Sequence, residues 1–356
     1  MPESMDNTAR PLVIPIFIPH AGCPHQCAFC NQSIITAQKS KLPGKNRIDK
    51  IIAQYLHYKG RRKKVELAFF GGNFLGLSPK HILNLLETVT PYILHNKIDG
   101  IRFSTRPDTI SQQALDLIIP FKISAIELGI QSMNDEVLLK SKRGHTAIDT
   151  IKAVDLLKKY SFTIGVQVMA GLPGDSENSL LKSTHALAEL APDFARIYPL
   201  MVLKGSPVEQ WYKKDLYQPL TLEESVTLVK QMYQIFKTAD INVIRMGLPA
   251  SDMMENDSMV LAGPWHPAFG HLVLSQIFYD EVCRKIDKNP ELLKTETLIL
   301  NVHPQSESRL RGDKNSNLKK LKLRYPGINF CINRDNPLQN KNIINIKPVV
   351  SQILTG

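Results

Sequence analysis

The sequence predicts an α/β protein: a partial (βα)6 barrel of the TIM-like kind, followed by a small C-terminal extension. Short apolar runs alternate with amphipathic helical patterns up to about residue 200. This alternation favours a parallel sheet, because each helix returns the chain across a face of the sheet. Several apolar runs are nearly continuous, as expected for strands that are covered on both faces.

The expected elements follow one another in a regular order. The strands are short, β-rich runs, and the helices have leucine and isoleucine at spacings of three and four. Six strands are predicted at 12–18, 64–70, 100–105, 125–130, 162–171 and 194–200. Helices are predicted near 46–59 and at 79–96, 111–119, 147–160, 179–190 and 221–239. Residues 241–247 are expected to add an edge strand.

The chain is expected to divide into two parts. Residues 1–275 form the barrel core, and residues 276–356 form a small basic C-terminal module. The second part contains a basic helical stretch and short strand-like runs such as "NIINI".

Charge and hydropathy restrict the class of protein. The net charge is +11, with basic stretches at 60–64 and 309–326. Such stretches fit either an RNA partner or a solvated basic face, and no DNA partner is expected. The N-terminal residues do not resemble a secretory signal, and no apolar run is long enough to cross a membrane. We therefore expect a cytoplasmic protein without a membrane partner, whose thiols stay reduced.

Three of the five cysteines lie in one short segment after the first predicted strand. Cys23, Cys27 and Cys30 form the pattern C-x3-C-x2-C. Thiolates select iron–sulfur clusters, zinc or copper(I). Structural zinc requires four ligands, for which His20 and His25 are the nearby candidates. A cubane cluster held by three cysteines instead leaves one iron open, at the barrel end where chemistry gathers.

This cysteine pattern, with the aromatic Phe29 before the last thiol, resembles the radical S-adenosylmethionine (SAM) superfamily. The resemblance implies that Cys23, Cys27 and Cys30 bind a [4Fe–4S] cluster whose open iron holds SAM. One electron, from a donor such as flavodoxin or ferredoxin, then cleaves SAM to a 5′-deoxyadenosyl radical that abstracts hydrogen from a substrate. The chain is thus expected to be an enzyme, and we assign no catalytic residue beyond the cluster.

A glycine-rich turn extends the resemblance. "FFGGNFLGL" places Gly71, Gly72 and Asn73 where the superfamily contacts the methionine amino group, and glycine permits that close approach. The superfamily often has Glu, Thr or Ser at the position of Asn73. By itself such a sequence is typical of an ordinary turn.

Two later motifs imply further cofactor contacts. In "ELGIQSMNDEVL", Glu127, Gln131 and Ser132 match positions that face the cofactor. In "KRGHT", Arg143 matches the group that meets the methionine carboxylate, to which its two-pronged guanidinium is suited. A glutamate within a buried strand is costly unless it is paired, so either a structural partner or the site must hold Glu127.

The motifs "STRPD", "ELGIQS", "KRGHT" and "RIYPLMVLKGSPVEQWY" resemble the radical-SAM part of the Elongator catalytic subunit and its shorter bacterial relatives. This resemblance implies tRNA as partner. Trp265 and Phe269 either stack bases or pack in a core. Residues 276–356 contain no glycine-rich acyl-CoA signature, which leaves the acetyl-dependent reaction of that group in doubt.

Two other functions stay open. Coproporphyrinogen-oxidase-like proteins share the cluster loop and the "GLPG" turn, and a basic chain would suit a polycarboxylate substrate. Alternatively, the cluster is a redox sensor on an RNA-binding scaffold and performs no catalysis. Formation of 5′-deoxyadenosine separates an enzyme from a sensor.

Overall fold

The computed structural model describes residues 11–18, 20–24, 26–31, 42–248, 259–334, 341 and 343–349. Contacts within the chain define two compact units. One comprises Met1–Thr221 with Met232–Trp265, and the other comprises Leu222–Gln231 with His266–Gly356. The division that the sequence suggests after residue 275 stays a prediction, because the two units are grouped by contacts and not by a single break in the chain.

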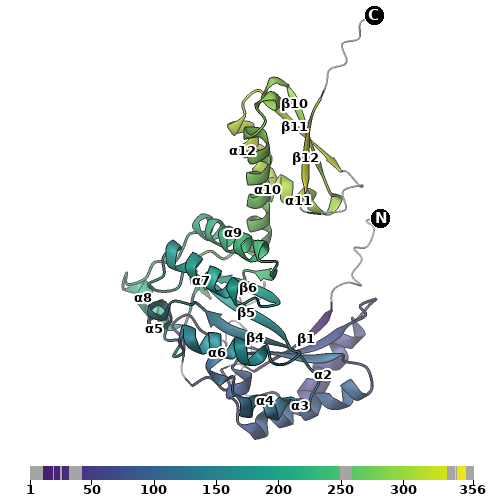
Figure 1. Ribbon diagram of the computed structural model, residues 1–356, viewed down its shortest axis with the longest axis vertical. Coiled ribbons are helices and arrows are strands. Elements are labelled where there is room, and N and C mark those ends of the chain that lie inside the picture. The colour runs from purple at the N-terminus through teal and green to yellow at the C-terminus, as the bar shows by residue number, and fades with distance from the viewer. Residues whose placement is uncertain are drawn as a thin grey trace, which may run out of the picture. The chain divides into compact units, whose positions relative to one another are not determined.

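The first unit contains a seven-stranded sheet in the described residues, with all neighbouring strands parallel. The sheet curls into a half-barrel surrounded by helices (Figure 1), so the predicted fold class is confirmed. The seventh strand is the edge strand expected near residue 241. In sheet order the strands are β1 (Leu12–Phe17), β2 (Val65–Phe70), β3 (Gly100–Thr105), β4 (Ile123–Gln131), β5 (Thr163–Ala170), β6 (Phe194–Pro199) and β8 (Asn242–Met246).

Several helices of the first unit begin at capping residues that the sequence provides. Thr146 opens one helix and Ser176 another, each through a reciprocal capping box. Two short helices, α5 and α8, were not predicted, because six or seven residues show a helical period only weakly. The helices are α2 (Lys45–His57), α3 (Pro79–Leu94), α4 (Gln112–Ile118), α5 (Asp135–Lys140), α6 (Ala147–Leu157), α7 (Glu177–Glu189) and α8 (Pro207–Lys213). Helix α9 (Leu222–Thr238) is shared by the two units.

Short elements complete the first unit. The 3-10 turns η1 (Phe74–Gly76) and η2 (Pro107–Thr109) follow β2 and β3. Strands β7 (Val202–Leu203) and β9 (Val260–Ala262) form a two-stranded antiparallel sheet. Trp265 packs against the small apolar cluster of Met201 and Leu203, whereas Phe269 is 2% exposed. These contacts favour core packing over base stacking for both aromatic residues.

One face of the parallel sheet holds a layer of buried charged side chains. Along β3 and β4, fully buried apolar residues alternate with Arg102 and Glu127, which therefore point to the opposite face. Glu127 is completely buried and lies 2.7 Å from Arg102 and 2.7 Å from Arg196 of β6, measured between nitrogen and oxygen atoms. Gln167 of β5 donates a third hydrogen bond to the same carboxylate at 3.4 Å.

The charged layer continues to β2. Arg102 also lies 3.2 Å from a carboxylate oxygen of Glu66, whose other oxygen is 2.8 Å from the exposed ammonium group of Lys64. Burial of an isolated charge costs several kcal/mol, but here acids and bases alternate and each is hydrogen-bonded. Glu127 is the residue on which both buried arginines converge.

The second unit has its own sheet and its own core. Strand β10 (Thr297–Val302) pairs in parallel with β11 (Asn329–Arg334) and antiparallel with β12 (Ile344–Pro348). Helices α10 (Phe269–Asp287), α11 (Glu307–Arg311) and α12 (Ser316–Arg324), together with the 3-10 turns η3 (Pro290–Lys294), η4 (Pro304–Ser306) and η5 (Asp313–Asn315), complete it. Cys283 is buried in this core and Cys331 is exposed on β11. Residue 342 of the predicted "NIINI" strand lies outside the described residues.

The charged layer predicts unequal effects of two matched substitutions. Glu127→Gln leaves Arg102 and Arg196 without their shared carboxylate, so we expect it to lower the free energy of unfolding by ~3–5 kcal/mol. Glu66→Gln should cost less, because Arg102 keeps Glu127. Urea denaturation of both variants measures the difference. Equal losses would contradict the central position of Glu127.

Candidate functional site

The three-thiol segment is a loop that leaves the end of β1 and is fastened to distant parts of the first unit. Cys27 is buried, and Cys23 and Cys30 are partly exposed. The amide of Ala28 donates to the carbonyl of Ser141 at 2.9 Å. The carbonyl of Ala28 accepts from the amide of Val208 at 2.8 Å. The loop is therefore hydrogen-bonded both to the end of α5 and to the first turn of α8.

The side chain of Asn73 joins this loop to the ends of β2 and β3. Asn73 is 1% exposed, and its amide nitrogen donates to the carbonyl of Gly22 at 2.9 Å. Its amide oxygen accepts from the hydroxyl of Thr105 at 2.7 Å and from the backbone of Arg106 at 3.0 Å. A carboxylate or hydroxyl in its place would lack the –NH2 donor that these contacts use.

Two glycines permit the close contact between the loop and the turn after β2. Gly22 has φ +71°, and a Cβ atom there would lie 2.1 Å from the carbonyl oxygen of Asn73. A Cβ atom on Gly72 would lie 2.3 Å from the carbonyl oxygen of Ile18 and 2.4 Å from that of Ala21. The Gly71–Gly72–Asn73 turn thus serves to seat the cysteine loop.

Arginine side chains place positive charge beside the thiols. Arg143 is buried, and its Nη1 donates to Sγ of Cys27 at 3.1 Å, while its Nη2 donates to the carbonyl of Gly129. Burial raises the pKa of the Cys23 thiol and the neighbouring Cys27 raises it further, whereas the guanidinium groups of Arg143 and Arg106 oppose this rise. Positive charge near a thiol favours the thiolate, the form that binds metals.

Of the remaining predicted residues, Gln131 lies beside the loop, whereas Ser132 and Glu127 make their contacts elsewhere. Gln131 has φ +76° at the end of β4, and its amide lies with the Arg143 guanidinium over Gly129, close to Cys27. Ser132 turns away, since its hydroxyl lies 3.3 Å from that of Ser183 on α7. The Glu127 carboxylate contacts Arg102 and Arg196 in the buried charged layer.

His145 is the second candidate of the "KRGHT" motif, which the sequence allows to be either part of the site or a plain loop. His145 is 5% exposed, and neither ring nitrogen has a hydrogen-bond partner among the described residues. Burial, together with the positive charges of Arg143 and Arg106, lowers the pKa of His145 to about 4, although Asp108 and Asp149 act in the opposite direction. The imidazole is therefore neutral at physiological pH, with one ring nitrogen as a donor and the other as an acceptor.

The donor set at this loop fits an iron–sulfur cluster and a polar ligand. Three soft thiols, two guanidinium groups and a buried imidazole without a partner lie in one neighbourhood. No group of three or more His, Cys, Asp or Glu side chains in the described part of the chain is arranged to hold a single metal ion. In a cubane each cysteine binds a different iron, so the thiolates surround the cluster instead of meeting at one point.

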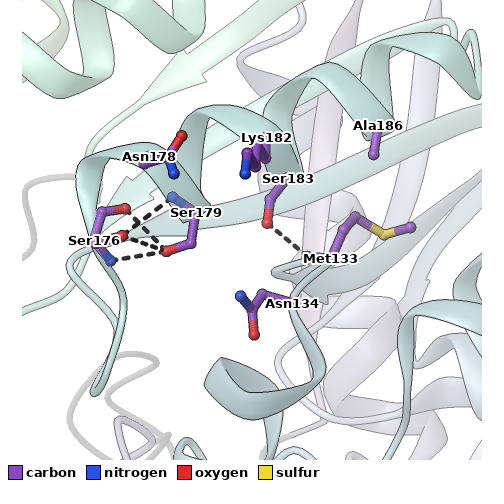
Figure 2. Close-up of a pocket in the computed structure, with 8 residues that line it drawn as sticks. All are labelled: Met133, Asn134, Ser176, Asn178, Ser179, Lys182, Ser183 and Ala186. Atoms are coloured by element: carbon purple, nitrogen blue, oxygen red, sulfur yellow. Dashed lines mark hydrogen bonds between the residues drawn. The ribbon is translucent and has the colours of Figure 1, made fainter.

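A separate polar groove with a volume of about 440 Å³ lies beside the start of α7 (Figure 2). Figure 2 shows Lys182 and Ser183 on the helix opposite Met133 and Asn134, which belong to the loop after β4. The hydroxyl of Ser183 accepts from the amide of Met133 at 3.2 Å. Of the predicted site residues, Ser132 contacts this groove through the hydroxyl of Ser183.

Comparison with known families identifies the class of protein. Residues 17–187 match the model of the radical SAM superfamily, and residues 192–278 match its radical SAM C-terminal domain. The chain belongs to the radical SAM superfamily, whose cofactors are a [4Fe–4S] cluster and SAM. Membership supports an enzymatic function. No helix among the described residues is long and apolar enough to cross a membrane.

The relatives that match include a tRNA uridine(34) acetyltransferase and Elongator complex protein 3. The chain is 30% identical to a tRNA uridine(34) acetyltransferase of Methanocaldococcus infernus over 42% of this chain and 29% of that protein. It is 24% identical to Elongator complex protein 3 of Homo sapiens over 48% of this chain and 35% of that protein. The matches thus span about a third of those curated relatives.

A solved structure shows the same fold. Elp3 of the archaeon Methanocaldococcus infernus, with its N-terminus deleted, matches with a TM-score of 0.57 at 21% sequence identity. The match covers 77% of this chain and 63% of that one.

The buried His145 predicts a pH-dependent stability. Its native pKa of about 4 lies below the ordinary value of 6.5. The unfolded chain therefore binds the proton more tightly, so stability is complete above pH 6.5 and falls as the pH drops toward 4. The loss should total about 3 kcal/mol. We expect His145→Gln to reduce this pH dependence in urea titrations, and the exposed His185→Gln to preserve it. If the free energy of unfolding depends on pH as strongly in the His145 variant as in the wild type, the lowered pKa of His145 is not the cause.

Proposed function

We propose that this protein is a radical SAM enzyme that reductively cleaves SAM at a [4Fe–4S] cluster, generates a 5′-deoxyadenosyl radical and acts in tRNA modification. The observation that carries the proposal is the cysteine loop, in which the buried Cys27 accepts a hydrogen bond from Arg143. When bound, the cluster and SAM supply the one-electron chemistry, and the protein supplies position and electrostatics.

In this proposal the residues around the loop have separate roles. Cys23, Cys27 and Cys30 bind three irons and leave the fourth for the amine and carboxylate of SAM. Arg143, which lies beside Cys27, offers a guanidinium to that carboxylate. Gln131, whose side-chain amide lies beside Gly129 as the Arg143 guanidinium does, is proposed to share this task. Asn73 holds the loop in place, so its effect on SAM passes through the loop.

The proposed partner is tRNA, and two observations support it: the names of the relatives and the net charge of the chain. The names of the tRNA uridine(34) acetyltransferase and of Elongator complex protein 3 support a tRNA substrate. The net charge of +11 is consistent with a polyanionic partner. The proposal does not extend to acetyl transfer, because the match covers 29% of the acetyltransferase. A tRNA substrate and metal-binding thiolates that stay reduced support a proposed cytoplasmic location.

Helix α12 is the proposed tRNA contact in the second unit. Lys319 and Lys322 are exposed and form no ion pair among the described residues. Lys320 lies over the ring of Tyr279, with 5.7 Å between the ammonium nitrogen and the ring centroid. Arg324 is paired with Asp287 at 2.9 Å, so it is a weaker candidate for phosphate binding than the lysines.

Turnover of SAM tests the enzymatic proposal. Anaerobic protein with dithionite and SAM should form 5′-deoxyadenosine, measured by liquid chromatography. Cys23→Ala, Cys27→Ala and Cys30→Ala should each reduce the yield to that of a reaction without protein, because a lost thiolate removes an iron ligand. The exposed Cys331→Ala serves as control and should keep both cluster and yield. A cluster that binds normally without any 5′-deoxyadenosine would indicate the sensor instead.

The role of α12 predicts a salt-dependent affinity for tRNA. Replacement of Lys319 and Lys322 by alanine should weaken binding and lower the slope of log K against log salt by about one unit for each lysine. Filter binding of bulk tRNA at several salt concentrations measures both quantities. Lys80 and Lys97, which are exposed in the first unit, provide a control double variant of equal charge. If the slope of log K against log salt is the same in the two double variants, the lysines of α12 do not bind phosphate. Helix α12 would then be only a solvated basic face.

A further inference from the structure

The second unit contains a short exposed loop between two helices that join two parallel strands. Strand β10 leads through η4 into α11, a four-residue loop follows, and α12 then leads into β11, which pairs in parallel with β10. The loop comprises Gly312, Asp313, Lys314 and Asn315, and we call it the GDKN loop. Gly312 is buried, whereas the three residues that follow it are exposed. The order strand–helix–loop–helix–strand therefore presents three polar side chains to solvent at one tight turn.

The GDKN loop is held in place by the helices around it. Gly312 has φ +73°, and a Cβ atom there would lie 2.5 Å from the hydroxyl oxygen of Ser316, so glycine allows α12 to begin directly after the loop. Asn317, in the first turn of α12, is 2% exposed. Its amide nitrogen donates to the carbonyl of Ser275 on α10 at 2.8 Å and to that of Arg309 on α11 at 3.1 Å. The loop is thus a rigid connection with an exposed tip.

This arrangement resembles the KH module of RNA-binding proteins. In that module a Gly-x-x-Gly loop clamps the backbone of about four nucleotides of a single strand. The GDKN loop differs at its fourth position, where Asn315 replaces glycine. Asn315 has φ +62°, a left-handed conformation that asparagine adopts more readily than most other residues. The replacement therefore keeps the backbone conformation that glycine would supply.

One flank of α12 continues the loop with positive charge. Asn315, Lys319 and Lys322 are spaced by four and three residues, which places them on the same side of the helix. Lys320 and Arg324 lie on the other side, where both contact α10. Lys319 and Lys322 therefore belong to the flank of α12 that faces away from α10.

The same flank lies beside an edge of the three-stranded sheet. The strand order is β11-β10-β12, so β11 is an edge strand among the described residues. Helix α12 packs against β11, and α10 packs against β12. The flank of α12 that faces away from α10 is therefore on the side of the outer edge of β11. The outer edge of such a strand carries backbone N–H and C=O groups that can hydrogen-bond to nucleic-acid bases.

The acids near this flank are few and most are neutralised. Residues 314–334 contain six lysine or arginine residues and no acid. Every acid of α10 and α11 is paired with a lysine or an arginine: Asp280, Glu281, Asp287 and Glu307. The carbonyl of Glu296 accepts from the first residue of β11, so Glu296 lies at the end of α12 that is remote from the loop. Asp313 is the acid that lies within the loop itself.

We propose that the GDKN loop, the lysine flank of α12 and the outer edge of β11 bind a single-stranded segment of RNA. The loop and the lysines hold the sugar–phosphate backbone, and the edge of β11 hydrogen-bonds to the bases. This inference rests on the proposed function, because it assigns the tRNA contact of the second unit to an unpaired part of the tRNA. In a duplex the base edges are paired and cannot reach the edge of a strand.

Two RNA probes test the preference for single strands. The full-length protein should bind a short, unstructured, fluorescein-labelled RNA oligonucleotide more tightly than the duplex of the same sequence, as measured by fluorescence anisotropy. A surface that recognises charge alone would favour the duplex, which has the higher charge density. Equal or tighter binding of the duplex would therefore overturn the proposal.

Charge reversal tests the loop itself. Lys314→Glu should lower the affinity for the single-stranded oligonucleotide on the order of tenfold, because an attractive contact with phosphate becomes repulsive. Lys347 is exposed on β12, at the opposite edge of the sheet, so Lys347→Glu is a control with the same change in charge in the same unit. The control should retain more of the affinity. An equal loss in both variants would mean that only the net charge of the unit matters.

Asp313→Asn tests the loop through a gain that misfolding cannot mimic. Removal of the acid from the loop should raise the affinity for the single-stranded oligonucleotide, because a repulsive charge beside the phosphates is lost. Glu87 is exposed on α3 in the first unit, and Glu87→Gln, with the same change in charge, should alter the affinity less. An unchanged affinity in Asp313→Asn would exclude the loop from the contact.

The two proposals fail in different ways. Wild-type protein that binds tRNA but forms no 5′-deoxyadenosine with dithionite and SAM would contradict the proposed function and would leave the RNA contact standing. Bulk tRNA that binds equally well to the wild type, Lys314→Glu and Asp313→Asn would overturn the role of the GDKN loop, whatever the yield of 5′-deoxyadenosine.

Discussion

The structure of the site depends on the way one amide side chain holds a cysteine loop against a parallel sheet. Asn73 donates to the loop at Gly22 and accepts from the end of β3 at Thr105 and Arg106. Because a primary amide is both donor and acceptor, a single side chain satisfies both sides of the junction. Gly22 and Gly72 allow the backbones to approach closely enough for this contact.

The same sheet separates its structural charges from those beside the thiols. Glu127 is enclosed by Arg102 and Arg196 in the charged layer on one face of the sheet. Arg143 lies instead with Cys27, at the loop. Both residues belong to motifs that the resemblance links to the cofactor, yet their described contacts differ. One motif therefore contains a residue of the buried charged layer, and the other contains a residue that lies beside the thiols.

The sequence was most informative where local patterns decide the structure. Strands buried on both faces read as apolar runs, so β1 to β6 were predicted to within a few residues. The cysteine spacing alone located the loop. By contrast, the ion pairs of Glu127 and the burial of His145 depend on residues that are distant in sequence, which no periodicity reveals. The short helices α5 and α8 were missed for a different reason, since six or seven residues show a helical period only weakly.

The central claim is a cluster held by three protein thiolates, with one iron free to bind SAM. Mössbauer spectroscopy of anaerobically prepared, iron-57-labelled protein tests it most directly. The account predicts a [4Fe–4S] spectrum in which addition of SAM changes a single iron site and leaves the others as they were. A spectrum that does not respond to SAM, or protein that contains tetrahedral zinc in place of iron, would contradict it.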